Sequence, residues 1–273
     1  MLFSTAKLYL VNNGFDAVFS DYLKNGHMVH AISVKFPDGS IGVNLTEKHL
    51  ERFDDDDERE FIDWVTEQIN LAPYTDVADW LDRDYILSHV RMCVQGISDE
   101  DIPKHICKGD LEEYYRVILD EGQGGYGSIK VTHEMLKSYG LTLDKVRAYA
   151  VNNLVEHVTI KSMFDTLIEM MGADKADLLG MDCTEAEQMF VATTDDKMYG
   201  AGVINLEGVL DRFAEDHGVD TLILIPSSIH EILIIIPNLD KHEDDINQMI
   251  NEVNATQVDK FDVLSNHVYY YYR

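Results

Sequence analysis

Two short apolar runs separated by a tight turn constrain the fold of this chain most strongly. The segment Leu222–Ile225 is followed by a Pro-Ser-Ser turn and then by a second run, Ile229–Ile236. Apolar runs of this length, bounded by turn residues, are typical of strands. Residues Ile232–Ile236 show no alternation of apolar and polar side chains, as expected when both faces of a strand are covered. We therefore predict two neighbouring strands, with Ile232–Ile236 at the centre of a sheet.

Further strand and helix signals surround these runs in the C-terminal third. Asn205 is a good N-cap for a helix that ends at Gly218. The resulting order is β-β-α-β-β-α-β with antiparallel hairpins, so we predict an α+β fold with helices packed on an antiparallel sheet. The other elements expected here are strands over Met189–Thr193 and Tyr199–Ile204 around a turn, a helix over Asp244–Val253 and a strand near Val268–Tyr272.

The preceding part of the chain also mixes helices and strands. His27–Lys35 and Ile41–Leu45 flank a Pro-Asp-Gly-Ser turn and predict a hairpin. No clear linker follows, so residues 1–100 and 101–273 are either two α+β regions or one continuous domain. We expect helices over Lys7–Leu23, Val77–Leu81, Leu111–Leu119, His133–Ser138, Thr142–Leu154 and Lys161–Met171, and strands over Tyr85–Val94 and Ser128–Val131.

The charge of the chain limits the classes of partner. It has 50 Asp and Glu residues against 22 Lys and Arg, a formal net charge of −28 over 273 residues. This field repels phosphate backbones and anionic membranes, so we expect no direct nucleic-acid binding and no membrane binding. Three cysteines without a CxxC spacing favour a reducing compartment. No signal-peptide pattern and no apolar run of spanning length is present, so we expect a soluble cytoplasmic protein.

The carboxylates are densest in the acidic run Glu51–Glu60, which belongs to the N-terminal region. Asp57, followed three residues later by Glu60, resembles a capping box for a helix that begins at Phe61. The four consecutive residues Asp54, Asp55, Asp56 and Asp57 are candidate binding residues. They lack the glycine and the spaced ligands of an EF-hand loop, so we predict no dedicated metal site there; loose binding of divalent cations is the alternative.

Ser227, Ser228, His230 and Glu231 form the only cluster with the residue types of nucleophilic catalysis. A serine hydrolase needs its histidine held between the nucleophile and the acid. On one extended strand, Ser228 and His230 share a face whereas Glu231 points to the other. The alternative interpretation is a turn in which Pro226 and the serine hydroxyls satisfy backbone groups. The candidate catalytic residues are therefore Ser228, His230 and Glu231.

Other motifs predict no cofactor. Gly122–Gly127 matches G-x-G-x-x-G, but the segment before it reads as a helix and the one after it as a strand, which favours a loop over a nucleotide site. His133-Glu134 begins like a zincin motif, yet Lys137 occupies the position of the second histidine. His105 and Cys107 are the nearest approach to metal-ligand spacing, and a zinc site requires more ligands than these two.

Several segments carry a resemblance to a known family. They are Tyr199–Val203, Ile225–Glu231 and Asn251–Tyr270, together with Leu111–Leu119, Ser128–Thr132 and Asn152-Asn153. Together they resemble the bacterial family called domain of unknown function 5688, and the likeness is weakest in the N-terminal third. The resemblance implies a protein of Gram-positive bacteria, often encoded near mobile elements. The family has no assigned activity, so the resemblance leaves the function open.

Two hypotheses from different classes follow. The first is a non-catalytic interaction protein whose acidic surface engages a basic protein partner, for example a nucleic-acid-binding protein whose site it occupies. The second is a hydrolase that uses the segment Ser227-Ser228-His230-Glu231. A third reading, in which the charge is only a solvated surface, stays open because the sequence does not show whether the carboxylates gather on one face.

Overall fold

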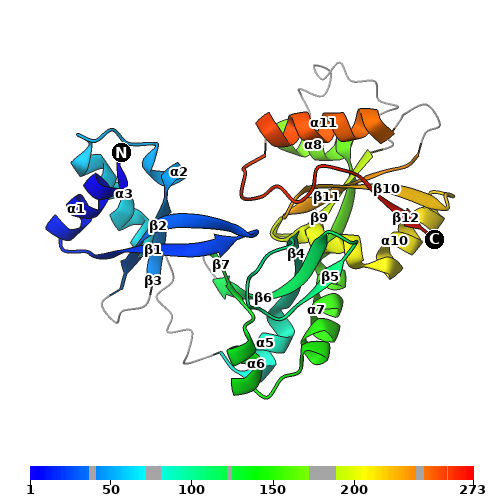
Figure 1. Cartoon of the computed structure of the whole chain (residues 1–273), viewed down its shortest axis with the longest axis horizontal. Coiled ribbons are helices and arrows are strands. Elements are labelled where there is room, and N and C mark those ends of the chain that lie inside the picture. Colours follow the sequence, from blue (N-terminus) through cyan, green and yellow to red (C-terminus); the bar gives the residue numbers. More distant parts are fainter. Residues whose placement is uncertain (37–40, 72–80, 122–124, 172–188, 238–242, 257) are drawn as a thin grey trace. The chain divides into compact units, whose positions relative to one another are not determined.

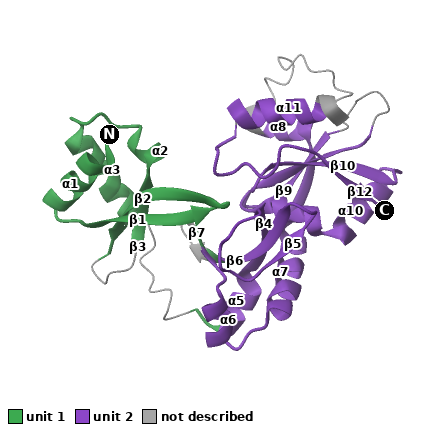
Figure 2. Cartoon of the chain, viewed as in Figure 1, with its two compact units in different colours: residues 1–82, 118–128 green, residues 83–117, 129–273 purple. Residues whose placement is uncertain are grey.

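The computed structural model describes residues 1–36, 41–71, 81–121, 125–171, 189–237, 243–256 and 258–273 (Figure 1). The chain forms two compact units (Figure 2). The first contains residues 1–82 and 118–128, and the second contains residues 83–117 and 129–273. Because residues 118–128 return to the first unit, neither unit is one continuous segment of the chain.

The first unit is a three-stranded antiparallel sheet with helices on one face. Its strands are β1 (Asp16–Lys24), β2 (His27–Lys35) and β3 (Ile41–Thr46), in that spatial order. Its helices are α1 (Phe3–Asn12), α2 (Glu47–Leu50) and α3 (Glu58–Leu71). Apolar side chains from one sheet face and all three helices form a single core, with Ala6, Leu10, Ala17, Ile32, Val34, Leu45, Leu50, Phe53, Phe61 and Val65 buried.

The predicted hairpin is confirmed by the pairing of β2 with β3; its Pro-Asp-Gly-Ser turn lies outside the described residues. The helix predicted over Lys7–Leu23 is wrong, because α1 ends at Asn12 and β1 follows. Gly14, with φ of 85°, provides the left-handed residue that stops the helix. β1 then pairs with β2 from Asp16 to Lys24 across a tight turn at Asn25 and Gly26, whose positive φ angles suit a hairpin, and this pairing outweighs the helix-like spacing of the sequence.

The second unit mixes helices and strands throughout. Its helices are α5 (Arg83–His89), α6 (His133–Ser138), α7 (Leu143–His157), α8 (Met163–Met171), the 3₁₀ helix η2 (Gly200–Asn205), α10 (Glu207–Asp216) and α11 (Glu243–Thr256). Its strands are β4 (Val90–Gly96), β5 (Lys104–Cys107), β6 (Leu111–Glu121), β7 (Gly125–Lys130), β8 (Val158–Ser162), β9 (Met189–Thr194), β10 (Thr221–Ser228), β11 (Glu231–Ile235) and β12 (Tyr269–Tyr272). Two of these strands are divided between the units: residues 118–121 of β6 and 125–128 of β7 belong to the first unit.

The larger sheet of the second unit confirms the α+β prediction. Its strand order is β12-β10-β11-β9-β8, and all pairs are antiparallel. β11 therefore lies at the centre, as its unbroken apolar run predicts. Helix α11 packs on one face through Ile246 and Ile250, which are buried against Ile223, Ile225 and Ile235. No helix among the described residues is long and apolar enough to cross a membrane.

The smaller sheet corrects two predictions. Its order is β4-β6-β5, and β7 also pairs with β6. Residues Tyr85–Val94 were expected to form one strand but divide between α5 and β4, and the helix expected over Leu111–Leu119 is strand β6. β6 is buried on both faces and pairs with β4 and β5. This pairing satisfies its backbone groups, and its Tyr, Val and Ile side chains suit a covered strand.

A 3₁₀ helix replaces the strand expected over Tyr199–Ile204. Strand β9 consequently continues into η2 and α10, and the observed order is β-η-α-β-β-α-β. Asn205 does not cap α10; Leu206 occupies the N-cap position, and the Asn205 amide instead donates to Glu113 at 3.2 Å. The first three residues of the Gly122–Gly127 motif lie outside the described residues, and the motif ends inside β7.

Candidate functional site

The segment Ser227–Glu231 forms the tight connection between β10 and β11. Ser228 pairs with Glu231 across the turn, after a register shift that follows Ile225. The Ser227 hydroxyl donates to Glu231 Oε1 at 3.0 Å, and the Ser228 hydroxyl accepts the backbone N–H of His230 at 3.1 Å. These contacts close a hairpin turn with side-chain hydroxyls, which is a structural use of serine.

The imidazole of His230 lies between two other segments. Its Nδ1 accepts the backbone N–H of Tyr199 at 3.2 Å, so the proton of the neutral ring is on Nε2. Nε2 lies 3.9 Å from Oδ1 of Asp262. A general base needs a ring nitrogen with an available lone pair facing the nucleophile. With Nδ1 bonded to backbone and Nε2 facing a carboxylate, the geometry favours a structural role for His230.

The backbone of His230 is held as firmly as its ring. Its carbonyl oxygen accepts Gly200 N–H at 3.0 Å and the Thr193 hydroxyl at 2.8 Å. A Cβ on Gly200 would lie 2.6 Å from this carbonyl oxygen, and a Cβ on Gly202 would lie 2.4 Å from the carbonyl oxygen of Met92. Both glycines therefore permit backbone-to-backbone packing that no side chain allows. We call the packing of η2 against β4 and the β10–β11 turn the η2 junction.

A half-buried polar cluster borders the η2 junction. Tyr199 adopts left-handed backbone angles, with φ of 54°, and the Arg116 guanidinium lies 4.9 Å from its ring centroid. Lys130 forms an ion pair with Glu100 at 2.6 Å. Burial raises the pKa of the Cys93 thiol to about 12, so this cysteine stays protonated and unreactive at neutral pH.

Two adjacent carboxylates on β6 are a feature that the sequence prediction missed. Glu112 accepts from Gln95 and Ser98 at 2.6 Å each and pairs with Lys104, while Glu113 accepts from Arg147 at 2.8 Å. Burial opposes ionisation of Glu112, but its hydrogen-bond donors outweigh burial and lower its pKa. Alternation along a strand would have placed these residues on opposite faces, but the segment was predicted to be a helix. Both carboxylates therefore accept hydrogen bonds from neighbouring side chains, and their role is structural.

The acidic run lies in the first unit, separate from the serine and histidine segment. Asp54–Asp57 form the loop between α2 and α3, and Asp54, Asp55 and Asp56 are exposed. Asp55 accepts the backbone N–H of Leu2 at 2.7 Å, and Asp57 accepts that of Asp54 at 3.0 Å. The Asp57 carboxylate thus closes its own loop, and α3 begins at Glu58, three residues before the predicted start.

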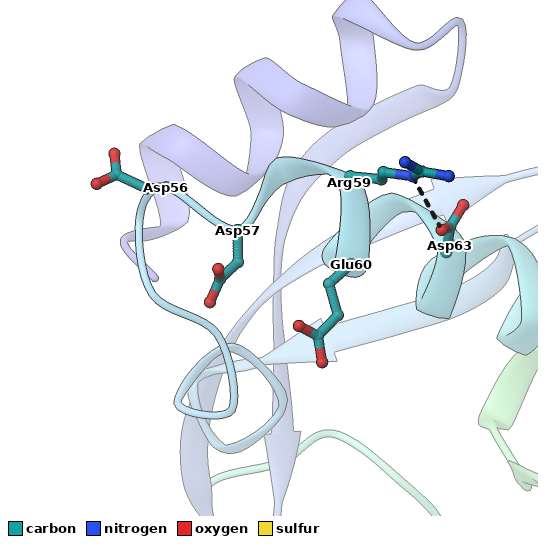
Figure 3. A pocket seen from close by; sticks show the side chains of 5 residues that line it. All are labelled: Asp56, Asp57, Arg59, Glu60 and Asp63. Carbon is teal, nitrogen blue, oxygen red and sulfur yellow. Dashed lines mark ion pairs between the residues drawn. The ribbon is translucent and has the colours of Figure 1, made fainter.

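An open pocket of about 370 Å³ adjoins this loop, lined by Asp56, Asp57, Arg59, Glu60 and Asp63 (Figure 3). Figure 3 shows the carboxylates of Asp57 and Glu60 on the same side, while Arg59 turns toward Asp63. Arg59 and Asp63 are 3.9 Å apart and both highly exposed, so this pair neutralises little of the local charge. Among the described residues, no group of three or more His, Cys, Asp or Glu side chains is arranged to hold a metal ion.

The role of His230 can be tested by truncation. We expect His230→Ala to lower the free energy of unfolding by about 1–3 kcal/mol, because the Tyr199 amide loses its acceptor. The measurement is urea denaturation followed by circular dichroism. His105→Ala, at an exposed position of β5, is the control and should change stability by less than about 0.5 kcal/mol. Unchanged stability of His230→Ala would contradict the structural role.

Comparison with known proteins identifies the family of the chain but assigns it no activity. No curated protein and no solved structure matches it. Residues 97–273 match DUF5688, a family of unknown function. The match covers well over half of the chain and includes η2 and the β10–β11 turn, whereas β4, the third part of the η2 junction, precedes it. The chain therefore belongs to the DUF5688 family.

Proposed function

We propose that this protein is a non-catalytic interaction protein whose acidic surface engages a basic protein partner in the cytoplasm. The observation that supports the proposal is the clustering of carboxylates over Asp54–Asp57 and the start of α3, where Asp54, Asp55, Asp56 and Glu60 are exposed. These carboxylates stand in a chain with a net charge of −28. A nucleic-acid-binding protein is the expected class of partner, because its own site is built to bind arrayed negative charge.

The expected physical behaviour follows from the charges. Clustered carboxylates steer a basic partner toward the surface and speed association, and salt screens this attraction. Complex formation should therefore be strong at low ionic strength and weak at high ionic strength. The hydrolase alternative has no comparable support, because His230 presents no available lone pair to Ser227 or Ser228.

A charge-neutralising variant tests the proposal. We expect the quadruple substitution of Asp54, Asp55, Asp56 and Asp57 by Asn to abolish retention of the partner, while the Asn side chains keep oxygen atoms that accept the loop hydrogen bonds. The measurement is an affinity pull-down from nuclease-treated lysate of the source organism, washed at low and at high salt, with retained proteins identified.

The matched control removes the same number of charges from exposed positions of the second unit, through D101N, E134Q, D144N and E156Q. The proposal expects one defined basic protein that is retained by the native chain and by this control at low salt and released at high salt. If both variants lose it equally, net charge rather than the acidic loop is responsible. If nothing basic is retained at either salt concentration, the carboxylates are a solvated surface and the proposal fails.

A further inference from the structure

Helix α1 presents apolar side chains on two opposite sides. Ala6 and Leu10 are fully buried in the core of the first unit. Leu8 and Val11, which lie three residues apart and are neighbours on the helix surface, are 57% and 52% exposed. A single exposed leucine is ordinary, whereas adjacent exposed apolar residues rimmed by charge mark an interaction surface.

The exposed face of α1 continues onto strand β1. Lys7 lies four residues before Val11 and is its neighbour on the helix surface, and the Lys7 ammonium group lies 4.2 Å from the ring centroid of Phe19. Phe19 itself is 57% exposed. We call the surface formed by Leu8, Val11 and Phe19 the α1 patch. It lies entirely within the first unit, on α1 and the neighbouring strand (Figure 1).

Carboxylates border the α1 patch on two sides. On one side, the Tyr9 hydroxyl donates to the backbone oxygen of Asp55 at 2.7 Å, which holds the acidic loop against α1. On the other side, Asp21 shares the face of β1 that carries Phe19, and its side chain is 60% exposed. The surface is therefore apolar at Leu8 and Val11, carries the Lys7 ammonium group over Phe19, and is acidic at its rim, where Asp21 also contacts His30 at 2.7 Å.

We infer that the α1 patch is the docking site for a basic amphipathic segment of the partner, with apolar side chains on one face and Lys or Arg on the other. The inference rests on the proposed function and adds the location and the class of segment. Charge complementarity selects this occupant: the rim attracts Lys and Arg, and the centre buries apolar side chains. A second copy of the chain is disfavoured because each copy carries a net charge of −28.

Two synthetic peptides of identical composition test the inference. Each contains roughly 18 residues of Lys and Leu, about five helical turns. In the amphipathic peptide Leu recurs at helical spacing, and in the scrambled peptide Leu is dispersed around the helix. We expect the full chain to bind the amphipathic peptide at least about tenfold more tightly, measured by fluorescence anisotropy at low salt.

Three variants of the full chain complete the test. We expect the double variant L8S/V11S to lose the tenfold preference and to keep the weaker binding that both peptides share. Val155→Ser, on an exposed apolar position of α7 in the second unit, is the matched control and should keep the preference. The quadruple Asp54–Asp57 to Asn variant should weaken the binding of both peptides.

The outcomes separate the two proposals. Equal affinity of the native chain for both peptides, or a preference that survives in L8S/V11S, overturns the docking site and leaves the acidic interaction function standing. Failure of both peptides to bind at low salt overturns the proposed function and the docking site together. Circular dichroism melting of L8S/V11S verifies that the variant remains folded, as expected for substitutions at exposed positions.

Discussion

Gly202→Ala is expected to destabilise the second unit by about 3 kcal/mol or more. The added Cβ would lie 2.4 Å from the carbonyl oxygen of Met92 and 3.0 Å from Cδ2 of Leu154. The leucine side chain can rotate away, but Met92 lies in β4, whose backbone is fixed by its pairing with β6. The overlap can therefore be relieved only by moving η2 away from the sheet. A loss of this size is a large part of the 5–15 kcal/mol typical of folded domains.

Urea denaturation followed by circular dichroism measures the loss of stability. Tryptophan fluorescence shows which of the two units is destabilised. Trp64, one of the two tryptophans of the chain, lies in α3 of the first unit. We therefore expect the circular dichroism transition to shift more than the fluorescence transition. Gly208→Ala is the control, because a Cβ there meets nothing within 4 Å. It lies in α10, where alanine should stabilise by up to about 1 kcal/mol. Equal stability of the two alanine variants would contradict close packing at the η2 junction.

Arg91→Met is expected to cost about 3–5 kcal/mol. Arg91 Nη1 donates to both carboxylate oxygens of Asp196 at 2.9 and 2.8 Å and to the carbonyl oxygen of Met198 at 2.7 Å. The side chains of Arg91 and Asp196 are only 6% and 12% exposed. Methionine fills a similar volume but leaves the carboxylate buried without its cation. The pair also joins β4 to the turn after β9, so its loss loosens contact between the two sheets.

The loss should depend on pH in a defined direction. Burial alone would raise the pKa of Asp196, but the Thr194 hydroxyl and the charge of Arg91 outweigh burial and lower it. A carboxyl group with a lowered pKa in the folded state stabilises the fold above its unfolded pKa of about 3.9. This contribution is lost as the pH falls through the folded pKa. The difference between the native chain and Arg91→Met should thus be largest near neutral pH and shrink below about pH 4.

An exposed ion pair provides the control for Arg91→Met. Lys161 and Glu169 are 2.6 Å apart, yet their side chains are 47% and 52% exposed. Lys161→Met should change the free energy of unfolding by less than about 1 kcal/mol, because water screens the lost attraction. Denaturant titrations at neutral and at acidic pH measure both variants. A comparable loss in the two variants, or a loss that does not vary with pH, would contradict a buried ionised pair.

Local chemistry was sufficient to predict several elements. The apolar runs of β10 and β11, the turn between them and the hairpin of β2 and β3 follow from residue types over short stretches. The helix expected over Thr142–Leu154 is α7, and the Thr142 hydroxyl caps its start by accepting the N–H of Lys145. These predictions succeeded because each depends on neighbours in the sequence.

The candidate site shows the limit of such reasoning. The sequence placed Ser228, His230 and Glu231 near one another, and they do adjoin one turn. Their roles depend on Tyr199 and Asp262, which lie about 30 residues away on either side and whose contacts leave no distinctive spacing. The acidic loop was evident from composition, whereas its position beside the exposed face of α1 became evident only from the Asp55–Tyr9 contact.

The sequence by itself determined the fold class, the central strand and the strongly negative charge, since these depend on composition and on apolar runs within single segments. The tertiary structure decided that the ambiguous segment Leu111–Glu121 became strand β6, because pairing with β4 on one side and β5 on the other satisfies backbone groups that local propensity cannot. It also decided that Gly200 and Gly202 form a packed 3₁₀ helix rather than a strand. The physical reason is the close approach of backbones from β4 and the β10–β11 turn, a constraint that exists only once the chain has folded.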